Sequence, residues 1–167
     1  LSIIISIVLV ITSYFSKVVY NILYPIITFM KAVPTMAFIV LLLIWTSKDL
    51  SPIIIGILIS LPIFYDEMLN SLFNIDEGLL KMIKIYRVSK LDKIKVIVIP
   101  VIYMEIKKIM RSTISLIFKV VISSEVYAQP QYGIGSIIQF EKLQLNTSAI
   151  IGWMIIITLI ICFIDFI

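Results

Sequence analysis

Few side chains in this sequence could do chemistry, and the most informative are charged residues inside apolar stretches. Lys119 lies about two helical turns beyond Arg111 in a long apolar run, and Glu125 ends that run. A charge inside a membrane segment is costly and is by default a functional hypothesis. Lys119 is therefore either a cation lining a pathway that suits an anionic solute or a long side chain reaching outward to the membrane surface. From the residues alone, Glu125 is an interfacial acid.

The residue types that usually carry out catalysis or bind metals are scarce in this sequence. The sequence has no histidine and one cysteine, Cys162, inside the last apolar run. Asp66 and Glu67 are adjacent, so on a helix they point about 100° apart and do not form a catalytic pair. The phosphate-binding pattern GxxxxGK[ST] does not occur. We expect no catalytic residue, no metal site and no cofactor in this chain.

The composition indicates a bilayer as the solvent of the fold. Apolar residues make up 61% of the 167 residues and charged residues 14%, with a mean hydropathy of +1.15. A soluble domain is roughly 45–50% apolar and about 25% charged. Long unbroken apolar runs can satisfy their backbone groups in lipid only as helices. We expect an all-α membrane protein that forms a single domain over residues 1–167. Because it begins inside an apolar run without a basic region, we expect it to be truncated at its N-terminus.

The apolar runs predict a bundle of about five transmembrane helices. Spanning the hydrocarbon takes about 20 helical residues. Pro34 lies inside the second run and predicts a kink, either a tolerated packing feature or a bend that shapes a pathway or its gate. Residues 126–146, with two glycines and a proline, are expected to form a loop. The predicted spans are residues 1–16, 25–46, 52–73, 100–125 and 143–164.

Charge asymmetry predicts how the spans are oriented. Nine of the fourteen basic residues lie between positions 76 and 111, and basic loops are cytoplasmic. With five spans, Lys17 falls on the same side, and the opposite loops contain only Lys48 and Lys142. We therefore expect residues 76–95 and the C-terminus in the cytoplasm.

A short amphipathic helix is predicted on that cytoplasmic side, between the third and fourth spans. Leu79, Met82, Ile83 and Tyr86 follow the spacing i, i+3, i+4, i+7, which gives one apolar stripe. The helix either lies on anionic lipid or docks in a groove of a soluble partner. In the second case its position would transmit motion of the partner into both neighbouring spans.

Five stretches follow one another in an order that resembles a known family. They are AVPTMA at 32–37 with IW at 44–45, LLKMIKIYRVS at 79–89 closing with VIP at 98–100, Arg111, Glu125 fourteen residues later, and GIG at 133–135. They are similar to the IPTLA helix, EAA-type loop, Gly-Leu-Arg, Ala-Glu and Gly-Leu-Gly of permeases in binding-protein-dependent ABC importers of the nitrate/sulfonate/taurine type. Lys81, Met82 and Ile83 stand where that family usually has Glu-Ala-Ala, and Arg87 stands at its glycine.

The resemblance implies a transport subunit rather than an enzyme. Two permease copies would form the pathway for a small anion such as nitrate, a sulfonate or taurine, or for a related small organic solute. A cytoplasmic ABC ATPase, which uses ATP and magnesium, would bind Leu79, Met82, Ile83, Tyr86 and Arg87. An extracytoplasmic binding protein would deliver the solute. The location implied is the plasma (inner) membrane of a prokaryote, with Glu125 near the external gate.

Two alternatives from other classes stay open. An ion-coupled secondary transporter often places paired acids at mid-membrane, whereas the acids here cluster near the ends of the runs. A non-transport membrane scaffold would use its basic helix only to bind lipid. Co-purification of an ATPase separates the permease from both alternatives.

Overall fold

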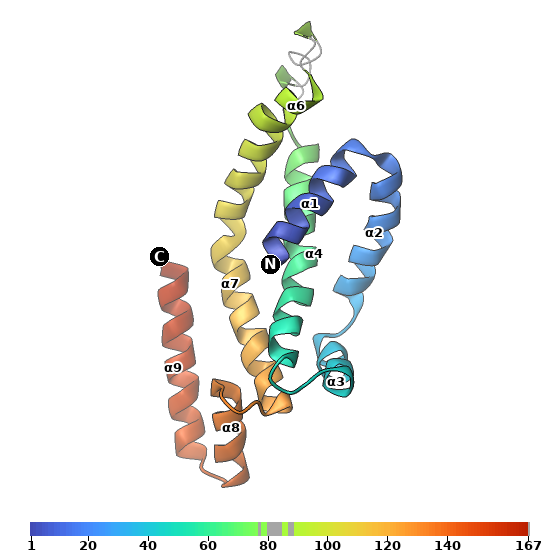
Figure 1. Ribbon diagram of the computed structural model, residues 1–167. Coiled ribbons are helices and arrows are strands. Elements are labelled where there is room, and N and C mark those ends of the chain that lie inside the picture. The colour runs from blue at the N-terminus through green and yellow to red at the C-terminus, as the bar shows by residue number, and fades with distance from the viewer. Residues whose placement is uncertain (77, 80–84, 87–88, 167) are drawn as a thin grey trace. The chain divides into compact units, whose positions relative to one another are not determined.

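The computed structural model describes residues 1–76, 78–79, 85–86 and 89–166, and all the regular structure of these residues is helical (Figure 1). The predicted all-α class is therefore confirmed for this part of the chain. The helices are α1 (Ser2–Phe15), α2 (Lys17–Ala32), α3 (Thr35–Trp45), α4 (Ser51–Phe73), α6 (Lys90–Lys93), the π-helical η1 (Ile94–Val98), α7 (Ile99–Ala128), α8 (Ile134–Leu143) and α9 (Thr147–Phe166).

The chain divides into two compact units. Unit 1 comprises Leu1–Thr28 and Leu61–Met110, and unit 2 comprises Phe29–Ser60 and Arg111–Ile167. The helices α2, α4 and α7 each contribute residues to both units. Each unit has its own buried residues, which are described separately below.

Small residues on α1 let it pack closely on α4 in unit 1. Ser6, Val10 and Ser13 are buried at the spacing i, i+4, i+7, which is one face of the helix. The Ser6 hydroxyl donates to the carbonyl of Leu61 at 3.0 Å, and the Tyr65 hydroxyl donates to Ser13 Oγ at 2.9 Å. Small side chains with hydroxyl groups are typical of helix contacts in membranes. The buried face of α4 in this unit is Phe64, Tyr65, Met68, Leu69 and Leu72.

The core of unit 2 joins α3, α4 and α7. Ile39, Leu42 and Ile55 form its buried cluster, and Val120 packs against them. At Gly56 an added Cβ would lie 3.2 Å from a methyl group of Val121. The glycine therefore allows α4 and α7 to approach closely.

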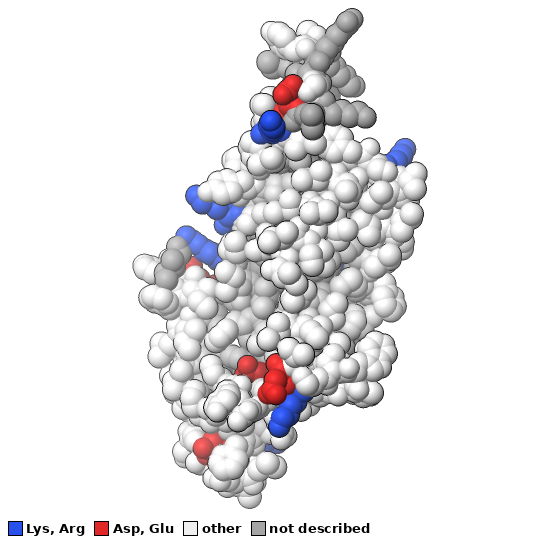
Figure 2. All heavy atoms as spheres, viewed as in Figure 1, with Lys and Arg blue, Asp and Glu red and all other residues white. Residues whose placement is uncertain are grey.

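Within the described part of the chain, two helices are long and apolar enough to cross a membrane by length and composition. They are α4, of 23 residues, and α9, of 20 residues; the bent pair α2 and α3 makes a third if it counts as one span. α1 is a shorter apolar helix of 14 residues. The face of the molecule shown in Figure 2 carries its charged side chains in a few small groups separated by broad uncharged areas. α4 and α9 agree with the third and fifth predicted spans, whereas the predicted bundle of five spanning helices is not confirmed.

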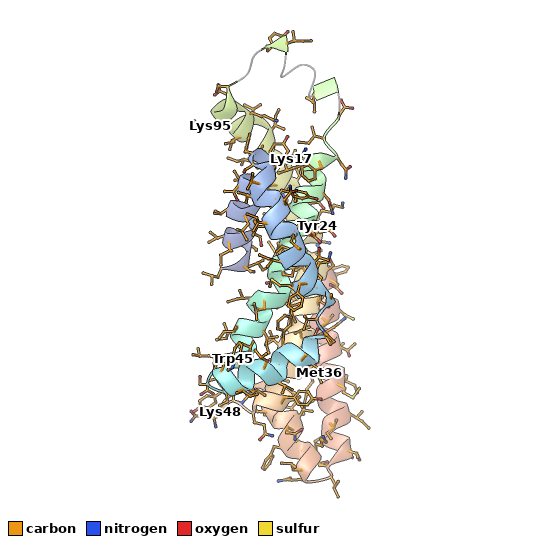
Figure 3. All side chains as sticks on the ribbon, turned by 90° about the vertical axis from the view of Figure 1, so that its right-hand side faces the viewer. Lys17, Tyr24, Met36, Trp45, Lys48 and Lys95 are labelled. Atoms are coloured by element: carbon orange, nitrogen blue, oxygen red, sulfur yellow. The ribbon has the colours of Figure 1, made fainter. Side chains whose placement is uncertain are left out.

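The second predicted span is wrong in two respects. Its helix begins at Lys17 rather than near residue 25, because Pro25 lies inside α2. It is also broken rather than kinked: Pro34 separates α2 from α3, and the two axes differ by 97° (Figure 3). Pro34 has a ψ of 130°, outside the helical range, and proline also disfavours helical backbone at the residue before it.

The predicted loop at 126–146 is also wrong in part, because it contains the ten-residue helix α8. The last helix correspondingly begins at Thr147 rather than at 143, and α7 extends from Ile99 to Ala128. The glycines of this stretch predicted a loop, but Gly133 is the N-cap of α8 and Gly135 lies in its first turn. Both glycines are close to the side chain of Glu125, which accounts for the helix start as described below.

Candidate functional site

The predicted docking segment connects α4 with α6. Residues 78, 79 and 85 are helical, and Asp76 Oδ2 accepts a hydrogen bond from the Leu79 backbone at 3.2 Å. Leu79 is 49% exposed, Ile85 76% and Tyr86 74%. Met82, Ile83 and Arg87, the other members of the predicted docking set, lie outside the described residues. The described part of this segment therefore presents large apolar side chains to its surroundings.

Aromatic rings and lysines gather in unit 1 next to this segment. The Lys93 ammonium lies 4.8 Å from the ring centre of Tyr14 and 5.8 Å from that of Phe15. Tyr14 also lies 6.2 Å from Phe73, the last residue of α4. Lys17, the first residue of α2, is exposed and lies toward the same end of unit 1 as Lys95 (Figure 3). We call Tyr14, Phe15, Lys17, Phe73 and Lys93 the basic end of unit 1.

Several helix ends come together at the basic end of unit 1. The end of α1, the start of α2, the end of α4 and α6 all meet there. Aromatic rings beside lysines are typical of the boundary between membrane and water. The arrangement therefore brings Lys17 and Lys93 to one end of unit 1, and the side of a membrane on which this end lies stays a prediction.

A buried carboxylate lies close to this end, within α7. Glu105 is 8% exposed, and its Oε2 accepts a hydrogen bond from Ser71 Oγ of α4 at 2.7 Å. Its Oε1 lies 3.3 Å from the ammonium of Lys108, whose side chain is 75% exposed. The sequence interpretation missed Glu105. A signal was present, because Glu105 shares a helix face with the apolar residues Val98, Ile102 and Ile109.

Glu125 lies at the opposite end of α7, where it caps α8. Its Oε2 accepts a hydrogen bond from the Gly135 backbone at 2.9 Å. A carboxylate at a helix N-terminus satisfies free N–H groups and complements the helix dipole. A Cβ added to Gly135 would lie 2.4 Å from the carbonyl oxygen of Ile122 and 2.7 Å from the Val126 nitrogen. Only glycine fits this crossing of α7 and α8.

Two loops of unit 2 meet beside this crossing. Gln131 donates its backbone N–H to Asp49 Oδ1 at 3.0 Å, which joins the α7–α8 loop to the turn before α4. Gln129 follows the end of α7 with a φ of 49°, in the left-handed region that ends many helices. We call Asp49, Glu125, Gln131, Gly133 and Gly135 the loop end of unit 2. The two loops that it joins are the ones predicted to share one side of the membrane.

The remaining predicted site residues are not gathered into one site. Lys119 is exposed on α7, and its backbone carbonyl accepts a hydrogen bond from Ser123 Oγ at 2.9 Å. Pro34 is exposed at the break between α2 and α3. Whether Lys119, Glu125 or Pro34 lines a pathway or a gate stays a prediction.

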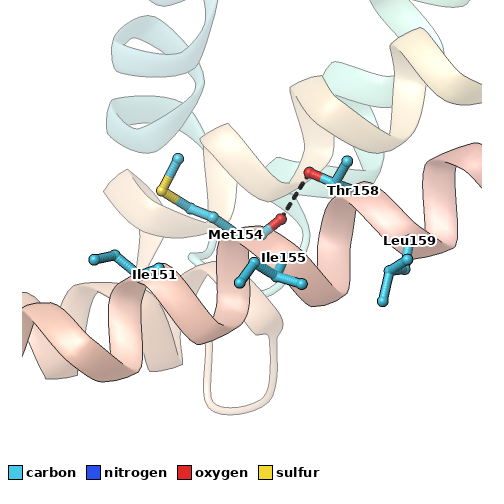
Figure 4. Close-up of a pocket in the computed structure, with 5 residues that line it drawn as sticks. All are labelled: Ile151, Met154, Ile155, Thr158 and Leu159. Carbon is cyan, nitrogen blue, oxygen red and sulfur yellow. Dashed lines mark hydrogen bonds between the residues drawn. The ribbon is translucent and has the colours of Figure 1, made fainter.

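α9 carries a polar contact and an apolar hollow. Asp165, near its C-terminus, accepts a hydrogen bond from Ser115 Oγ of α7. The hollow is lined by residues of α9 alone, and Thr158 Oγ1 donates to the Met154 carbonyl at 2.8 Å within it (Figure 4). Because a single helix forms it, the hollow encloses nothing and is a feature of the helix surface. Its residues are Ile151, Met154, Ile155, Thr158 and Leu159.

Metal chemistry finds no support in the described part of the chain. No group of three or more histidine, cysteine, aspartate or glutamate residues there is placed to hold a metal ion.

Comparisons of the chain with models of protein families, with curated proteins and with solved structures find no match.

Proposed function

We propose that this chain is a membrane-spanning permease subunit of an ATP-driven importer. The observation that carries the proposal is the exposure of Leu79, Ile85 and Tyr86 on the segment that links α4 to α6 and α7. Exposed apolar side chains outside a membrane are typical of a surface that a partner covers. A partner bound there would act on two long helices through one segment.

The proposal commits to a division of labour between chains. The docking surface takes a cytoplasmic ABC ATPase, which binds ATP and magnesium, and this chain contributes no catalytic residue. Two copies of the chain form the pathway, and an extracytoplasmic binding protein delivers the solute. The solute is a small anion or a related small organic molecule, and the complex lies in the plasma membrane of a prokaryote.

The transport step in this proposal is alternating access. Closure of the ATPase subunits pushes on residues 76–95 and rocks α4 and α7. Binding of the ATPase and solute shifts the population between inward-open and outward-open states, each by its difference in affinity for the two states. Lys119 and the break at Pro34 are the candidates for the pathway, and Glu125 belongs to the outer end.

The test is a matched pair of tyrosine substitutions. Tyr86→Asp places a charge on the docking surface, whereas Tyr132→Asp places the same charge at a tyrosine that is 84% exposed beside the loop end. Both side chains are exposed, so both variants should reach normal levels in the membrane. We expect Tyr86→Asp to lose the co-purifying ATPase in mild detergent and Tyr132→Asp to keep it. Retention of the ATPase by both variants would contradict the docking surface.

A second pair separates docking from adhesion to lipid. Lys81→Gln and Lys84→Gln remove charges from the same segment, where each charge near an anionic lipid surface contributes about 1 kcal/mol. If the segment docks through its apolar residues, these changes should affect ATPase binding less than Tyr86→Asp does. If binding to anionic vesicles falls and no ATPase is found with the unchanged protein, the lipid-binding scaffold is the better account.

A further inference from the structure

The buried stripe that runs from the end of η1 into α7 in unit 1 contains one residue out of keeping with its neighbours. Val98, Ile102, Glu105 and Ile109 repeat at the spacing i, i+4, i+7, i+11, and all four are buried. The facing part of α4 buries large apolar side chains, including Met68 and Leu72. A carboxylate therefore occupies a core position between two apolar helix faces.

The carboxylate of Glu105 is held by one contact across helices and one along its own helix. The Ser71 hydroxyl of α4 donates to Oε2 at 2.7 Å, within the normal range for such a bond. Lys108, three residues further along α7, lies 3.3 Å from Oε1 and is itself largely exposed. The bond to Ser71 is thus a buried polar link between α4 and α7, whereas the charge of the exposed Lys108 is screened by its surroundings.

Stability alone does not account for this carboxylate. Desolvating a charge is costly, and replacing a buried charged group by a well-packed apolar side chain is often neutral or stabilising. A hydrogen bond has a preferred length and direction, so it adds a directional requirement to the apolar packing of the two helix faces. The contact therefore supplies a defined register between the two helices.

The Ser71–Glu105 contact lies close to the ends of α4 and α7 that the docking segment connects. Ser71 lies in the last turn of α4, and Glu105 lies about two turns into α7. The docking segment joins these two helix ends through α6 and η1. A force on the segment reaches both helices within a few residues of the Ser71–Glu105 contact.

We infer that Glu105 is a positioning residue, which holds α4 and α7 in one register so that both helices respond together when a partner pushes on the docking segment. The inference rests on the proposed function for the identity of the partner. The Ser71–Glu105 contact itself is a property of the isolated chain, so it can be tested without the partner.

The test compares register with stability in the full chain, purified in mild detergent. Cys162 is replaced by serine, and spin labels are attached at exposed positions 70 and 104, on α4 and α7. The variants are Glu105→Gln, which keeps an acceptor for Ser71, Glu105→Ala, and Ser71→Ala combined with Glu105→Leu. Glu67→Gln, an exposed acid on α4, is the matched control.

We expect the unchanged protein, Glu67→Gln and Glu105→Gln to share a narrow distribution of label distances. Glu105→Ala and the apolar double variant should broaden it, and the double variant should nevertheless unfold at the same temperature as the unchanged protein or higher. Rescue by glutamine together with this separation of register from stability is the signature of a positioning role. An unchanged distance distribution in the apolar double variant would overturn the inference.

The same variants distinguish this inference from the proposed function. With a co-purified ATPase, ATP and vanadate should change the distance distribution in the unchanged protein, and this response should be lost in the apolar double variant while the ATPase stays bound. If no ATPase binds the unchanged protein, the proposed function fails and the partner-free comparison still decides the role of Glu105. A full nucleotide response in the double variant would overturn the inference with the ATPase still assigned.

Discussion

The basic end of unit 1 and the loop end of unit 2 are held by different kinds of contact. At the basic end, a lysine lies 4.8 Å and 5.8 Å from two ring centres, and Tyr14 lies 6.2 Å from Phe73. At the loop end, a Cβ on Gly135 would come within 2.4 Å of a backbone oxygen, and Glu125 caps a helix at 2.9 Å. The first set joins side chains to side chains, whereas each contact of the second set involves the backbone of the α8 start.

This difference indicates which end can adjust. Contacts between a lysine and aromatic rings tolerate changes of position because the attraction varies slowly with geometry. Two helix backbones in contact at a glycine have no free volume to give, because packed interiors are close to crystalline density. An end that receives motion from a partner should be adjustable, and an end that holds loops in place should be rigid. The predictions below test that contrast.

The largest loss of stability is expected from a substitution of Gly135. Gly135→Ala forces its Cβ against the Ile122 carbonyl and the Val126 nitrogen, so the backbone must move. Overpacking of this kind costs about 1–3 kcal/mol, and the thermal unfolding temperature in detergent should fall clearly. Gly152→Ala is the control, because no atom lies within 4 Å of its added Cβ and alanine favours helix. Equal effects of the two substitutions would remove the argument for a rigid loop end.

A smaller effect is expected from the cap of α8. Glu125→Ala removes the acceptor of the Gly135 N–H, and loss of a helix cap costs about 0.5–2 kcal/mol. Glu125→Gln keeps an acceptor but loses the charge that complements the helix dipole, so it should cost less. Hydrogen exchange of residues 134–143 measures the change directly, and unchanged protection in Glu125→Ala would show that α8 does not depend on this side chain.

At the basic end, the loss of stability expected from removing the Lys93 cation is smaller still. Lys93→Gln removes the cation beside Tyr14 and Phe15, and such contacts contribute about 0.5–1 kcal/mol at exposed sites. Lys93→Arg keeps the cation and should restore most of the loss. Thermal unfolding and quenching of tyrosine fluorescence report the two changes. A loss as large as that of Gly135→Ala would make the basic end a rigid joint and reverse the contrast.

The smallest effect is expected at Asp49. Asp49→Ala removes one exposed hydrogen bond to the Gln131 backbone, and water can replace it. The change in stability should be within about 0.5 kcal/mol, as for most surface substitutions. Hydrogen exchange should rise only near residues 129–133 and not in α8. Loss of protection throughout α8 would mean that Asp49, rather than the crossing at Gly135, keeps the loop end in place.

The sequence predicted the helices that depend on local features and missed those that depend on other parts of the chain. The third span was expected at 52–73 and is found at Ser51–Phe73, because an apolar run bounded by Lys48, Asp49 and Asn74 defines its own ends. The start of α8 depends on the carboxylate of Glu125, ten residues before Gly135, and no rule for glycine-rich stretches contains that contact. Glycine near a helix start was therefore interpreted as loop.

The break at Pro34 and the burial of Glu105 were harder to predict for similar reasons. A proline predicts a lost hydrogen bond and a bend, but the size of the bend depends on what packs against each half of the helix. Glu105 lies near the start of the fourth predicted span, close to the basic residues Lys107 and Lys108, and its contact partner Ser71 is 34 residues away on another helix. In both cases the decisive neighbours come from distant parts of the sequence.

The helix α9 is exposed along its length and is held mainly near its two ends. None of its residues 147–166 is buried, whereas half of the most apolar window of α4 is buried. A short turn connects α9 to α8 at one end, and Asp165 near the other end accepts a hydrogen bond from Ser115 of α7. Packing against neighbouring helices fixes the tilt of a membrane helix, so a helix with little such packing can change its tilt to match the thickness of the bilayer. Lipids with shorter acyl chains should therefore increase the tilt of α9 from the membrane normal, and lipids with longer acyl chains should decrease it, while the tilt of α4 changes little.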